Sequence, residues 1–373
     1  MKTSEIQNLK IAIVGGGYAG ASAALALLQL GADVHVYEQA PELGEVGAGI
    51  GLRPPTVEVL RKWGVFEEFA KVSAPSEAIE VYQSNGELIA RDPWPGINEY
   101  AQTNHCRMVH RGDVIETLLR LLPAERVHIG HKMITVTDNG DSATVKFENG
   151  VEVTADLVLG ADGIRSSVRN QVFGEVQPVF SHTIAMRAVI SADDAYGLVE
   201  NDNFRVYVGL NGTTVYFLPL RHRNQVSFDI TAPSEDTAWA PEVTHEYIGQ
   251  LLEGFDERLQ KIGQELDIAA MTNRGVYDIE KQPNWHTNSV ALVGDAAHAM
   301  LHHQGQGANS AMQDAAWLAD AIKDGADLQD ALRTYQAKRK PITDVLQDIS
   351  RKPFDIGDSF PETTSFKKGA GVE

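Results

Sequence analysis

The chain has 373 residues, of which 43% are hydrophobic and 22% charged, a composition typical of a folded globular protein rather than a disordered or fibrous one. Its 51 acidic and 32 basic residues give a formal charge of −19, which disfavours nucleic acid and anionic membrane surfaces as partners. The single cysteine, Cys106, excludes an internal disulfide and a multi-cysteine metal site, so we expect no metal and a cytoplasmic protein. At roughly 150 residues per domain, the length indicates two domains.

The N-terminal segment is predicted to form a βαβ unit. Residues 10–14 have the pattern of a short strand, residues 18–30 form an Ala- and Leu-rich helix pattern, and residues 34–37 return to a strand pattern. The apolar stretch 11–32 is about long enough to cross a bilayer, but three consecutive glycines interrupt it and charged residues follow at once. We therefore expect a strand, a tight turn and a helix, and no membrane segment.

The next part of the chain alternates between helix and hairpin patterns. Asn-Gly pairs mark the hairpin turns, because both central positions of such turns favour positive φ. The expected elements are a helix at 54–63, two strands within 79–90 around Asn85-Gly86, a helix at 111–122, a hairpin at 133–147 around Asn139-Gly140, and a buried strand at 156–159.

From about residue 177 to residue 231 the pattern becomes rich in strands. Polar turns separate the four runs 184–189, 204–208, 214–220 and 225–230, which predicts a separate antiparallel sheet. Helix and strand patterns then alternate again, and we expect this last part to rejoin the first domain. Its elements are a helix at 243–252, a strand at 289–293, and long helices at 308–322 and 330–347, followed by a loose tail after Lys352.

The first chemical signal is a glycine fingerprint between a strand and a helix. Gly15 permits a tight turn, Gly17 lets the backbone approach a pyrophosphate, and Gly20 allows close packing of helix and strand. Glu38 ends the second strand, where a carboxylate can accept hydrogen bonds from a ribose. The motif predicts a dinucleotide site but does not separate FAD from NAD.

Two further motifs follow buried strands. The first contains Asp162 in the run Gly-Ala-Asp-Gly-Ile-Arg-Ser-Ser-Val-Arg at 160–169. The second contains Asp295 in Gly-Asp-Ala-Ala-His at 294–298, with Gly-Gln-Gly-Ala-Asn following at 305–309. With the fingerprint, and in this order, these motifs resemble those of the class A flavoprotein aromatic monooxygenases, the para-hydroxybenzoate hydroxylase fold group. The subgroup resembled is that of salicylate hydroxylase and 6-hydroxynicotinate 3-monooxygenase.

The resemblance covers nearly the whole chain and implies its fold class and domains. It implies an α/β fold in which a Rossmann-type FAD-binding domain is interleaved with an antiparallel β-sheet substrate domain and ends in C-terminal helices. The boundaries expected are 1–75, 101–176 and 271–351 for the FAD-binding domain and C-terminal helices, 76–100 for a substrate-domain hairpin, 177–270 for the substrate domain, and 352–373 for the tail.

The resemblance also assigns residues to the cofactor. It implies that FAD is held by Gly15, Gly17, Gly20, Glu38, Ala48, Gly49, Ile50, Arg111, Asp162, Asp295, Gly305, Gly307, Ala308 and Asn309. A helix start near residues 305–309 suits the negative charge that reduction places on the flavin ring. Arg165 and Arg169 are candidate contacts for NAD(P)H, the alternative being a solvated helix face.

The chemistry implied is that of a single-component hydroxylase. Since the chain has no second glycine fingerprint, NAD(P)H is expected to bind transiently, whereas FAD binds tightly and without a covalent link. Reduced flavin would capture O₂ as a C4a-hydroperoxide and hydroxylate a small electron-rich aromatic or heteroaromatic molecule. An epoxidase or indole-type oxygenase, or a flavin-binding protein or oxidase without oxygen transfer, stays open. The choice between NADH and NADPH, and between monomer and homodimer, also stays open.

Four residues are candidates for catalysis or substrate binding. His303 occupies a place where hydroxynicotinate-type relatives also have histidine, and His302 replaces the usual proline. Tyr216 is a possible base, and Arg187 is suited to a substrate carboxylate because its guanidinium can bind bidentately. Each has an alternative structural role. The chain departs from its relatives at Gly51 and Pro55, so substrate identity is not transferred. Tyr207 and Phe217 could also line the pocket, while Cys106 is expected to be packed.

Overall fold

The computed structural model describes residues 1–42, 47–93, 105–302 and 305–352. The chain divides into two compact units. Unit 1 contains the ranges Met1–Gly44, Ile115–Val179 and Tyr277–Pro353, and unit 2 contains Glu45–Val114 and Phe180–Val276. Residues 47–75 and 105–114 therefore group with the β-rich unit by contact, although we expected them in the FAD-binding domain. The assignment of a cofactor domain and a substrate domain stays a prediction.

Unit 1 is built on a parallel sheet with the strand order β18-β12-β1-β2-β8. Every pairing in it is parallel, and β12 and β18 are buried along their whole length, as strands covered on both faces are. The last α/β segment therefore rejoins the first, as predicted. The strands are β1 Lys10–Val14, β2 Asp33–Tyr37, β8 Val127–His128, β12 Leu157–Gly160 and β18 Val290–Leu292.

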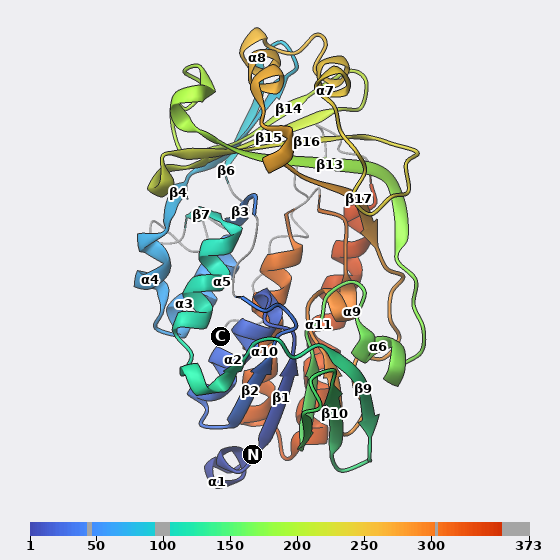
Figure 1. Ribbon diagram of the computed structural model, residues 1–373. Helices are drawn as coiled ribbons and strands as arrows, with labels where there is room; N and C mark the ends of the chain where they lie inside the picture. Colours follow the sequence, from blue (N-terminus) through green and yellow to red (C-terminus); the bar gives the residue numbers. More distant parts are fainter. Residues whose placement is uncertain (43–46, 94–104, 303–304, 353–373) are drawn as a thin grey trace. The chain divides into compact units, whose positions relative to one another are not determined.

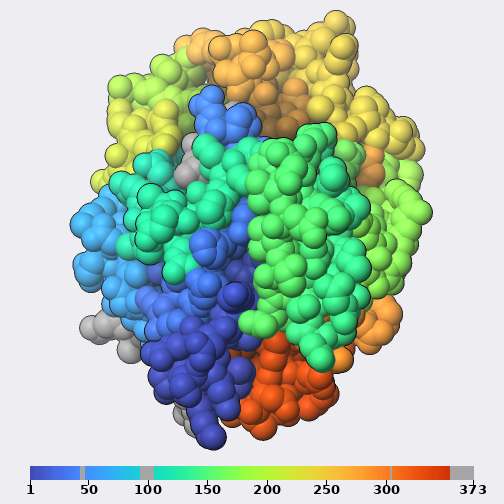
Figure 2. All heavy atoms as spheres, turned by 60° about the horizontal axis from the view of Figure 1, so that its bottom comes forward, coloured from blue at the N-terminus to red at the C-terminus, as the bar shows by residue number. Residues whose placement is uncertain are grey.

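Helices and a small antiparallel sheet complete unit 1 (Figure 1). The Ala-rich α2 packs against α10, α10 packs against α11, and the sheet β11-β10-β9 contacts β1 and β12. In Figure 2 the dark blue N-terminal segment lies beside the orange-red end of α10, in agreement with the contact between α1 and α10. The elements are α1 Thr3–Gln7, α2 Tyr18–Gln29, β9 Met133–Asp138, β10 Ala143–Phe147, β11 Glu152–Ala155, α6 Ser167–Val172, α9 Asp295–His298, α10 Gly307–Asp324 and α11 Leu328–Ser350.

Unit 2 is built on a seven-stranded sheet with the order β17-β13-β16-β15-β14-β5-β6. The four predicted strands form its centre and pair antiparallel, but β14 pairs in parallel with β5. The predicted hairpin at Asn85-Gly86 is thereby part of this sheet, which is mixed rather than wholly antiparallel. The strands are β5 Ala78–Gln83, β6 Leu88–Pro93, β13 Val179–Ser191, β14 Phe204–Val208, β15 Thr214–Leu220, β16 Gln225–Pro233 and β17 Thr272–Asp278.

The two faces of the seven-stranded sheet have different neighbours (Figure 1). On one face, Phe217, Phe228 and Ile230 form a core with the helices α7 His245–Leu251 and α8 Glu257–Glu265. On the other face, Tyr216 and Leu218 pack with residues of the three-stranded sheet β3-β7-β4. Asp229, which lies directly opposite Tyr216 on the neighbouring strand, is on this second face. The remaining elements are β3 Gly49–Leu52, α3 Pro54–Lys62, α4 Phe66–Lys71, β4 Ser73–Ser76, β7 Cys106–His110 and α5 Arg111–Arg120, which continues from unit 2 into unit 1.

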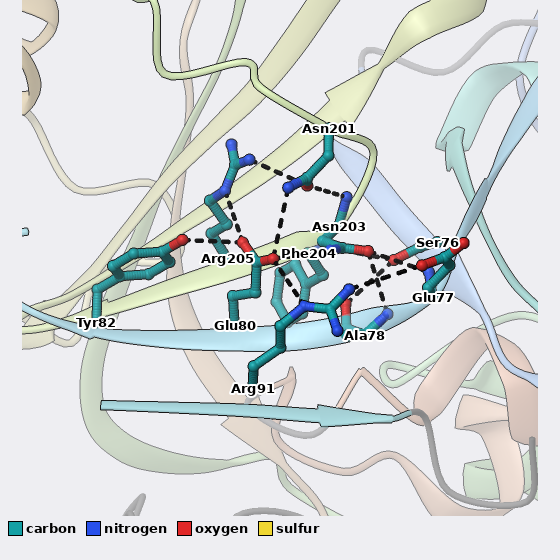
Figure 3. Close-up of polar contacts among 10 residues, drawn as sticks. All are labelled: Ser76, Glu77, Ala78, Glu80, Tyr82, Arg91, Asn201, Asn203, Phe204 and Arg205. Carbon is teal, nitrogen blue, oxygen red and sulfur yellow. Dashed lines mark hydrogen bonds and ion pairs between the residues drawn. The ribbon is translucent and has the colours of Figure 1, made fainter. Parts of the chain in front are cut away.

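A buried ion pair joins β5 to β14 (Figure 3). Glu80 and Arg205 face each other across the parallel pairing, and Nε of Arg205 lies 3.1 Å from Oε2 of Glu80. Both residues are almost fully buried. Asn203 and Tyr82 also donate hydrogen bonds to the carboxylate, at 2.7 and 2.9 Å. A buried charge is tolerated when it is paired and hydrogen-bonded in this way, and here the network fixes the register of the parallel pairing.

The structure confirms the expected packing of Cys106, which is fully buried, and burial raises the pKa of its thiol. The predicted tail after Lys352 lies outside the described residues. None of the helices within the described ranges has the length and apolarity needed to span a membrane. In the same ranges, no three or more His, Cys, Asp or Glu side chains are arranged to hold a metal.

Candidate active site

The glycine fingerprint forms the turn between β1 and α2. Gly15 has φ +105°, and a Cβ there would lie 2.4 Å from the carbonyl oxygen of Ala161. A Cβ at Gly20 would lie 1.9 Å from the carbonyl oxygen of Gly15, so both positions require glycine for packing. A Cβ at Gly17 would meet no described atom within 4 Å. Gly17 therefore leaves open space at the start of α2, where a phosphate can approach the backbone amides.

Glu38 directly follows β2 and faces the fingerprint loop. Its Oε2 accepts the amide hydrogen of Gly16 at 2.6 Å, and its Oε1 accepts that of Ala40 at 2.8 Å. These bonds fix the orientation of the carboxylate. Since each carboxylate oxygen has two lone pairs, acceptor capacity remains for the hydroxyl groups of a ribose.

Asp162 follows β12 and caps the start of α6. Its Oδ2 accepts the amide hydrogens of Ser167 and Val168 at 2.7 and 3.1 Å, and the Ser166 hydroxyl donates to Oδ1 at 2.5 Å. Burial raises the pKa of Asp162 even though these hydrogen bonds oppose the shift. The observed contacts of Asp162 are therefore those of a residue that shapes the loop.

Arg169 was a candidate contact for NAD(P)H, and the structure gives it contacts within unit 1. The side chain is fully buried, and its guanidinium donates to the carbonyl oxygens of Ala296 and Ile164 at 3.0 and 2.7 Å. Arg169 therefore links α6 to α9, so the alternative of a solvated helix face is wrong for this residue, and its contact with NAD(P)H stays a prediction. Arg165 is exposed.

Asp295 begins α9 and is exposed, while a buried network holds the preceding residue. Asp314 on α10 accepts the amide hydrogen of Gly294 at 2.9 Å, and it also contacts His298 Nε2 at 2.6 Å and Arg339 Nε at 2.7 Å. Burial opposes ionisation, but His298 and Arg339 hold the pKa of Asp314 below its usual value. The network fixes the loop that presents Asp295. Sequence reasoning missed Asp314, because an Asp inside a helix resembles a surface residue until its neighbours are known.

The glycine-rich segment at 305–309 leads into α10. Gly305 has φ +60° and donates its amide hydrogen to the carbonyl oxygen of His302 at 2.8 Å. Asn309 Nδ2 donates to the carbonyl oxygen of Gly305 at 2.9 Å, which closes the first turn. Gln306 is almost fully buried, and its Nε2 has no acceptor among the described residues. The catalytic candidate His303 lies outside the described residues.

Four predicted cofactor residues in unit 1 follow four strands of one parallel sheet. Gly15, Glu38 and Asp162 come after β1, β2 and β12, and Asp295 comes shortly after β18. The carboxyl ends of parallel strands meet at one edge of the sheet, which is where ligands bind in folds of this kind. Among the described residues, no atom lies within 4 Å of a Cβ at Gly17 or Gly305 and the Gln306 amide has no acceptor, which fits a phosphate-bearing ligand with polar acceptors.

The predicted cofactor residues of unit 2 also lie together. The amide hydrogen of Arg111 bonds to the carbonyl oxygen of Ala48 at 3.0 Å, at the point where β3 begins. Beside them, His110 accepts the amide hydrogen of Gly112 through Nδ1 at 3.2 Å, so its Nε2 donates to the carbonyl oxygen of Gly47 at 3.2 Å. Burial and the nearby Arg223 lower the pKa of His110, which favours this neutral tautomer. Ala48, Gly49, Ile50 and Arg111 therefore form one cluster.

Gly49 connects this cluster to the seven-stranded sheet. Its amide hydrogen bonds to Oγ of Ser227 at 2.7 Å, and the Ser227 hydroxyl in turn donates to Oδ1 of Asp229 at 2.7 Å. A Cβ on Gly49 would lie 2.9 Å from Cβ of Ser227 and 3.1 Å from Cβ of Leu218. Glycine is needed here because β3 approaches the sheet so closely.

Two of the four predicted catalytic residues meet through Asp229. Asp229 pairs with Arg187 on β13 and with Tyr216 on β15, so the three residues form one row across the sheet. Arg187 Nε lies 3.9 Å from Oδ2 of Asp229. Burial raises the pKa of Asp229 to about 6, and the charge of Arg187 limits that shift. Burial also raises the pKa of Tyr216, so its phenol stays protonated at neutral pH and is a poor base.

Ser227 and Asp229 were missed by sequence reasoning. The signal was a charged residue inside an otherwise apolar strand pattern, Ser-Phe-Asp-Ile, which is also typical of a strand with one exposed face. The two other pocket candidates, Tyr207 and Phe217, both lie in the core on the opposite face of the sheet, next to α7 and α8. Their proposed contact with substrate is wrong because the alternation of the strands points them away from the row.

Comparison with known proteins shows the family. The model of the FAD binding domain matches residues 8–350, which is most of the chain. The chain belongs to this family of FAD-dependent aromatic monooxygenases. The predicted fold class, the use of FAD and the hydroxylation of aromatic or heteroaromatic compounds are thereby confirmed.

Relatives of this FAD-dependent monooxygenase cover nearly its whole length. A 3-amino-4-hydroxybenzoate 2-monooxygenase of Streptomyces cremeus is 31% identical over 95% of this chain and 88% of its own. A salicylate hydroxylase of Pseudomonas putida is 31% identical over 91% of this chain and 84% of its own. Among solved structures, Klebsiella pneumoniae HpxO with FAD and uric acid superposes with a TM-score of 0.85 at 25% identity, over 92% of this chain and 87% of that chain.

Proposed function

We propose that this monooxygenase hydroxylates a small electron-rich aromatic or heteroaromatic acid with NAD(P)H and O₂. The single observation that carries the choice of an acid is the row Arg187–Asp229–Tyr216, which places a guanidinium on the polar face of the sheet. A guanidinium is the side chain best suited to a planar carboxylate. The names of two relatives, a hydroxybenzoate monooxygenase and a salicylate hydroxylase, agree with this choice.

FAD is proposed to bind tightly and without a covalent link, at Gly15, Gly17, Gly20, Glu38 and Asp295 in unit 1, with Asp162 shaping the loop beside them. Residues 305–309 offer the amides of the α10 start, including those of Gly307 and Ala308, and unit 2 offers Ala48, Gly49, Ile50 and Arg111. When bound, FAD supplies the redox chemistry, taking electrons from NAD(P)H and activating O₂ for transfer to the ring. The protein orients the ring and excludes water. NAD(P)H is proposed to bind transiently, since the chain has one glycine fingerprint.

Two adjacent histidines are candidates for a role at the substrate, on sequence grounds, and we propose that role for one of them. His303 is the proposed positioning or acid–base group, and His302 beside it is the matched control. His303→Ala is expected to leave FAD content unchanged and to slow hydroxylation by about 10²–10⁴-fold, the usual contribution of an acid–base group. His302→Ala is expected to have the smaller effect. If the His303 variant and the wild type have the same turnover, and the same fraction of NAD(P)H oxidation leads to hydroxylated product, His303 has no role in the reaction.

The experiment that tests the function is a substrate panel. Purified holoenzyme is assayed for NAD(P)H oxidation with phenols, hydroxybenzoates, aminohydroxybenzoates, hydroxypyridines and indoles, and products are identified by mass after reaction under ¹⁸O₂. We expect an aromatic acid to stimulate the oxidation of NAD(P)H and to gain one labelled oxygen atom on its ring. Stimulated oxidation that yields only hydrogen peroxide would indicate an oxidase instead, and labelled epoxide from a non-phenolic substrate would indicate an epoxidase.

A further inference from the structure

Asp229 is a buried carboxylate with little hydrogen-bonding support. It is 9% exposed, and within the described part of the chain the one hydrogen bond that its oxygens accept comes from the Ser227 hydroxyl. Nε of Arg187 lies 3.9 Å from Oδ2 of Asp229, within ion-pair range but too far for a hydrogen bond. An ionised carboxylate offers about four acceptor sites, and leaving them empty in a buried place costs free energy. Asp229 therefore has capacity for a further donor.

Ser227 cannot supply more than it already does. A hydroxyl has one hydrogen, and Ser227 uses it on Asp229 while its oxygen accepts the amide hydrogen of Gly49. The close approach of Gly49, which admits no Cβ, holds this chain of bonds in place. The carboxylate of Asp229 is thus oriented by the strand β3, where residues 48–50 are proposed to flank the flavin.

The charges around Asp229 favour a ligand that carries both a carboxylate and a hydrogen-bond donor. From β13 it faces Arg187, from β15 Tyr216, and from the start of α5 the charge of Arg111, while β3 contributes the backbone of Gly49. A carboxylate on the ligand can pair with a guanidinium, but it would be repelled by Asp229. A hydrogen-bond donor on the same ring would instead be attracted by Asp229.

We propose that Asp229, oriented by Ser227, is a specificity-determining residue of this site, because its carboxylate accepts a hydrogen bond from a ring substituent of the bound substrate. The inference rests on the proposed function, because it assumes that the acid binds along the row Arg187–Asp229–Tyr216. It adds the residue that discriminates between substrates: a substrate without the donor leaves the remaining acceptor sites of the buried Asp229 carboxylate empty and binds weakly. A site built to bind a polar substituent rejects its apolar analogue strongly for this reason.

The test measures dissociation constants of the holoenzyme through perturbation of the flavin absorbance. Two matched pairs of ligands are used: 3-amino-4-hydroxybenzoate against the analogue with methyl in place of the amino group, and para-hydroxybenzoate against para-methylbenzoate. Wild type is expected to prefer the donor in at least one pair by about ten- to a hundredfold, the contribution of a hydrogen bond to a charged group. Asp229→Asn is expected to reduce that preference to within a few-fold, with FAD content unchanged.

Two further variants keep the test specific. Asp202→Asn removes a carboxylate from the Asp202–Arg221 pair elsewhere in unit 2 and is expected to keep the wild-type preference. Ser227→Ala leaves the carboxylate but removes the group that orients it, and an intermediate preference is expected; this variant also decides the matter if Asp229→Asn does not fold. If aromatic acids bind but all variants discriminate as the wild type does, the role of Asp229 is overturned and the proposed function stands. If wild-type holoenzyme binds no aromatic acid of the panel, both are overturned.

Discussion

The backbone amide of Gly16 lies 2.6 Å from Oε2 of Glu38, so the turn after β1 and the acidic residue after β2 are held together by the chain itself. The same carboxylate also accepts the amide hydrogen of Ala40. Glu38 therefore shapes the loop, and its contact with a ribose stays a prediction.

Replacement of Glu38 is expected to weaken FAD binding. Glu38→Ala removes both acceptor oxygens, and we expect the FAD dissociation constant to increase by the equivalent of about 1–3 kcal/mol. Glu38→Gln keeps one acceptor oxygen and is expected to fall between the wild type and the alanine variant. Quenching of FAD fluorescence during titration of the apoprotein measures the affinity. Equal affinities in the three proteins would place the ribose contact elsewhere.

The glycines at positions 17 and 20 are expected to fail in different ways. Gly17→Ala adds a Cβ where no described atom lies within 4 Å. The free energy of unfolding of the apoprotein, measured in urea, should therefore change by less than about 0.5 kcal/mol. FAD affinity should nevertheless decrease by at least about tenfold, because the Cβ would occupy the space that we propose for the pyrophosphate.

Gly20→Ala is the matched comparison for that variant. Its Cβ would lie 1.9 Å from the carbonyl oxygen of Gly15, and we expect a loss of about 3 kcal/mol in apoprotein stability. A Gly17→Ala apoprotein that unfolds as readily as Gly20→Ala would show that position 17 is constrained by packing and not by a ligand.

The ionisation of Asp229 is expected to cost stability at neutral pH. Folding raises the pKa of its carboxyl from 3.8 to about 6, so the folded protein binds a proton that the unfolded chain has lost between these values. This contribution therefore favours folding as the pH falls through the window and opposes it above about pH 6. Asp229→Asn should stabilise the apoprotein by about 1–3 kcal/mol at pH 8 and by clearly less at pH 5.

The measurement is urea unfolding of both apoproteins at the two pH values, with the difference between them taken at each pH. Groups shared by both proteins cancel in that difference. A variant that is less stable than wild type at pH 8 would show that the attraction between Asp229 and Arg187 exceeds the cost of burial.

The pair Glu80–Arg205 is expected to behave as a coupled unit (Figure 3). Either Glu80→Gln or Arg205→Met leaves one buried charge without its partner, and each should cost about 3–5 kcal/mol in urea unfolding. The double variant should cost less than the sum of the two, which a double-mutant cycle measures. Arg221→Met, which breaks the exposed pair with Asp202, should cost less than about 1 kcal/mol. Additive costs in the cycle would contradict the coupling.

Local signals in the sequence predicted most of the helices and strands. Asn85-Gly86 and Asn139-Gly140 mark their hairpin turns, in which the two glycines have positive φ but the two asparagines do not, and the fingerprint from Gly15 to Gly20 encodes a strand, a turn and a helix within a few residues. Such features require no knowledge of distant parts of the chain.

The residues that were missed depend on distant partners. Asp229 is buried because β13 and β15 lie on either side of it, and Asp314 is buried because His298 and Arg339 converge on it from other segments. The parallel pairing of β5 with β14 likewise has no local signal. In the opposite direction, Arg169 looked like an exposed helix residue until its contacts with Ala296 and Ile164 were known.

That parallel pairing also bears on how the chain folds during synthesis. Glu80 and Arg205 are 125 positions apart, so the ribosome completes the β5–β6 hairpin long before its neighbour β14 exists. Until then, the edge of β5 that will pair with β14 presents unpaired amide and carbonyl groups, a template for association with other chains. Sheets that depend on contacts of such long sequence separation also fold slowly. Unit 2 is therefore expected to be the part of this enzyme that limits its yield on expression, and truncated products that end before residue 204 are expected to aggregate.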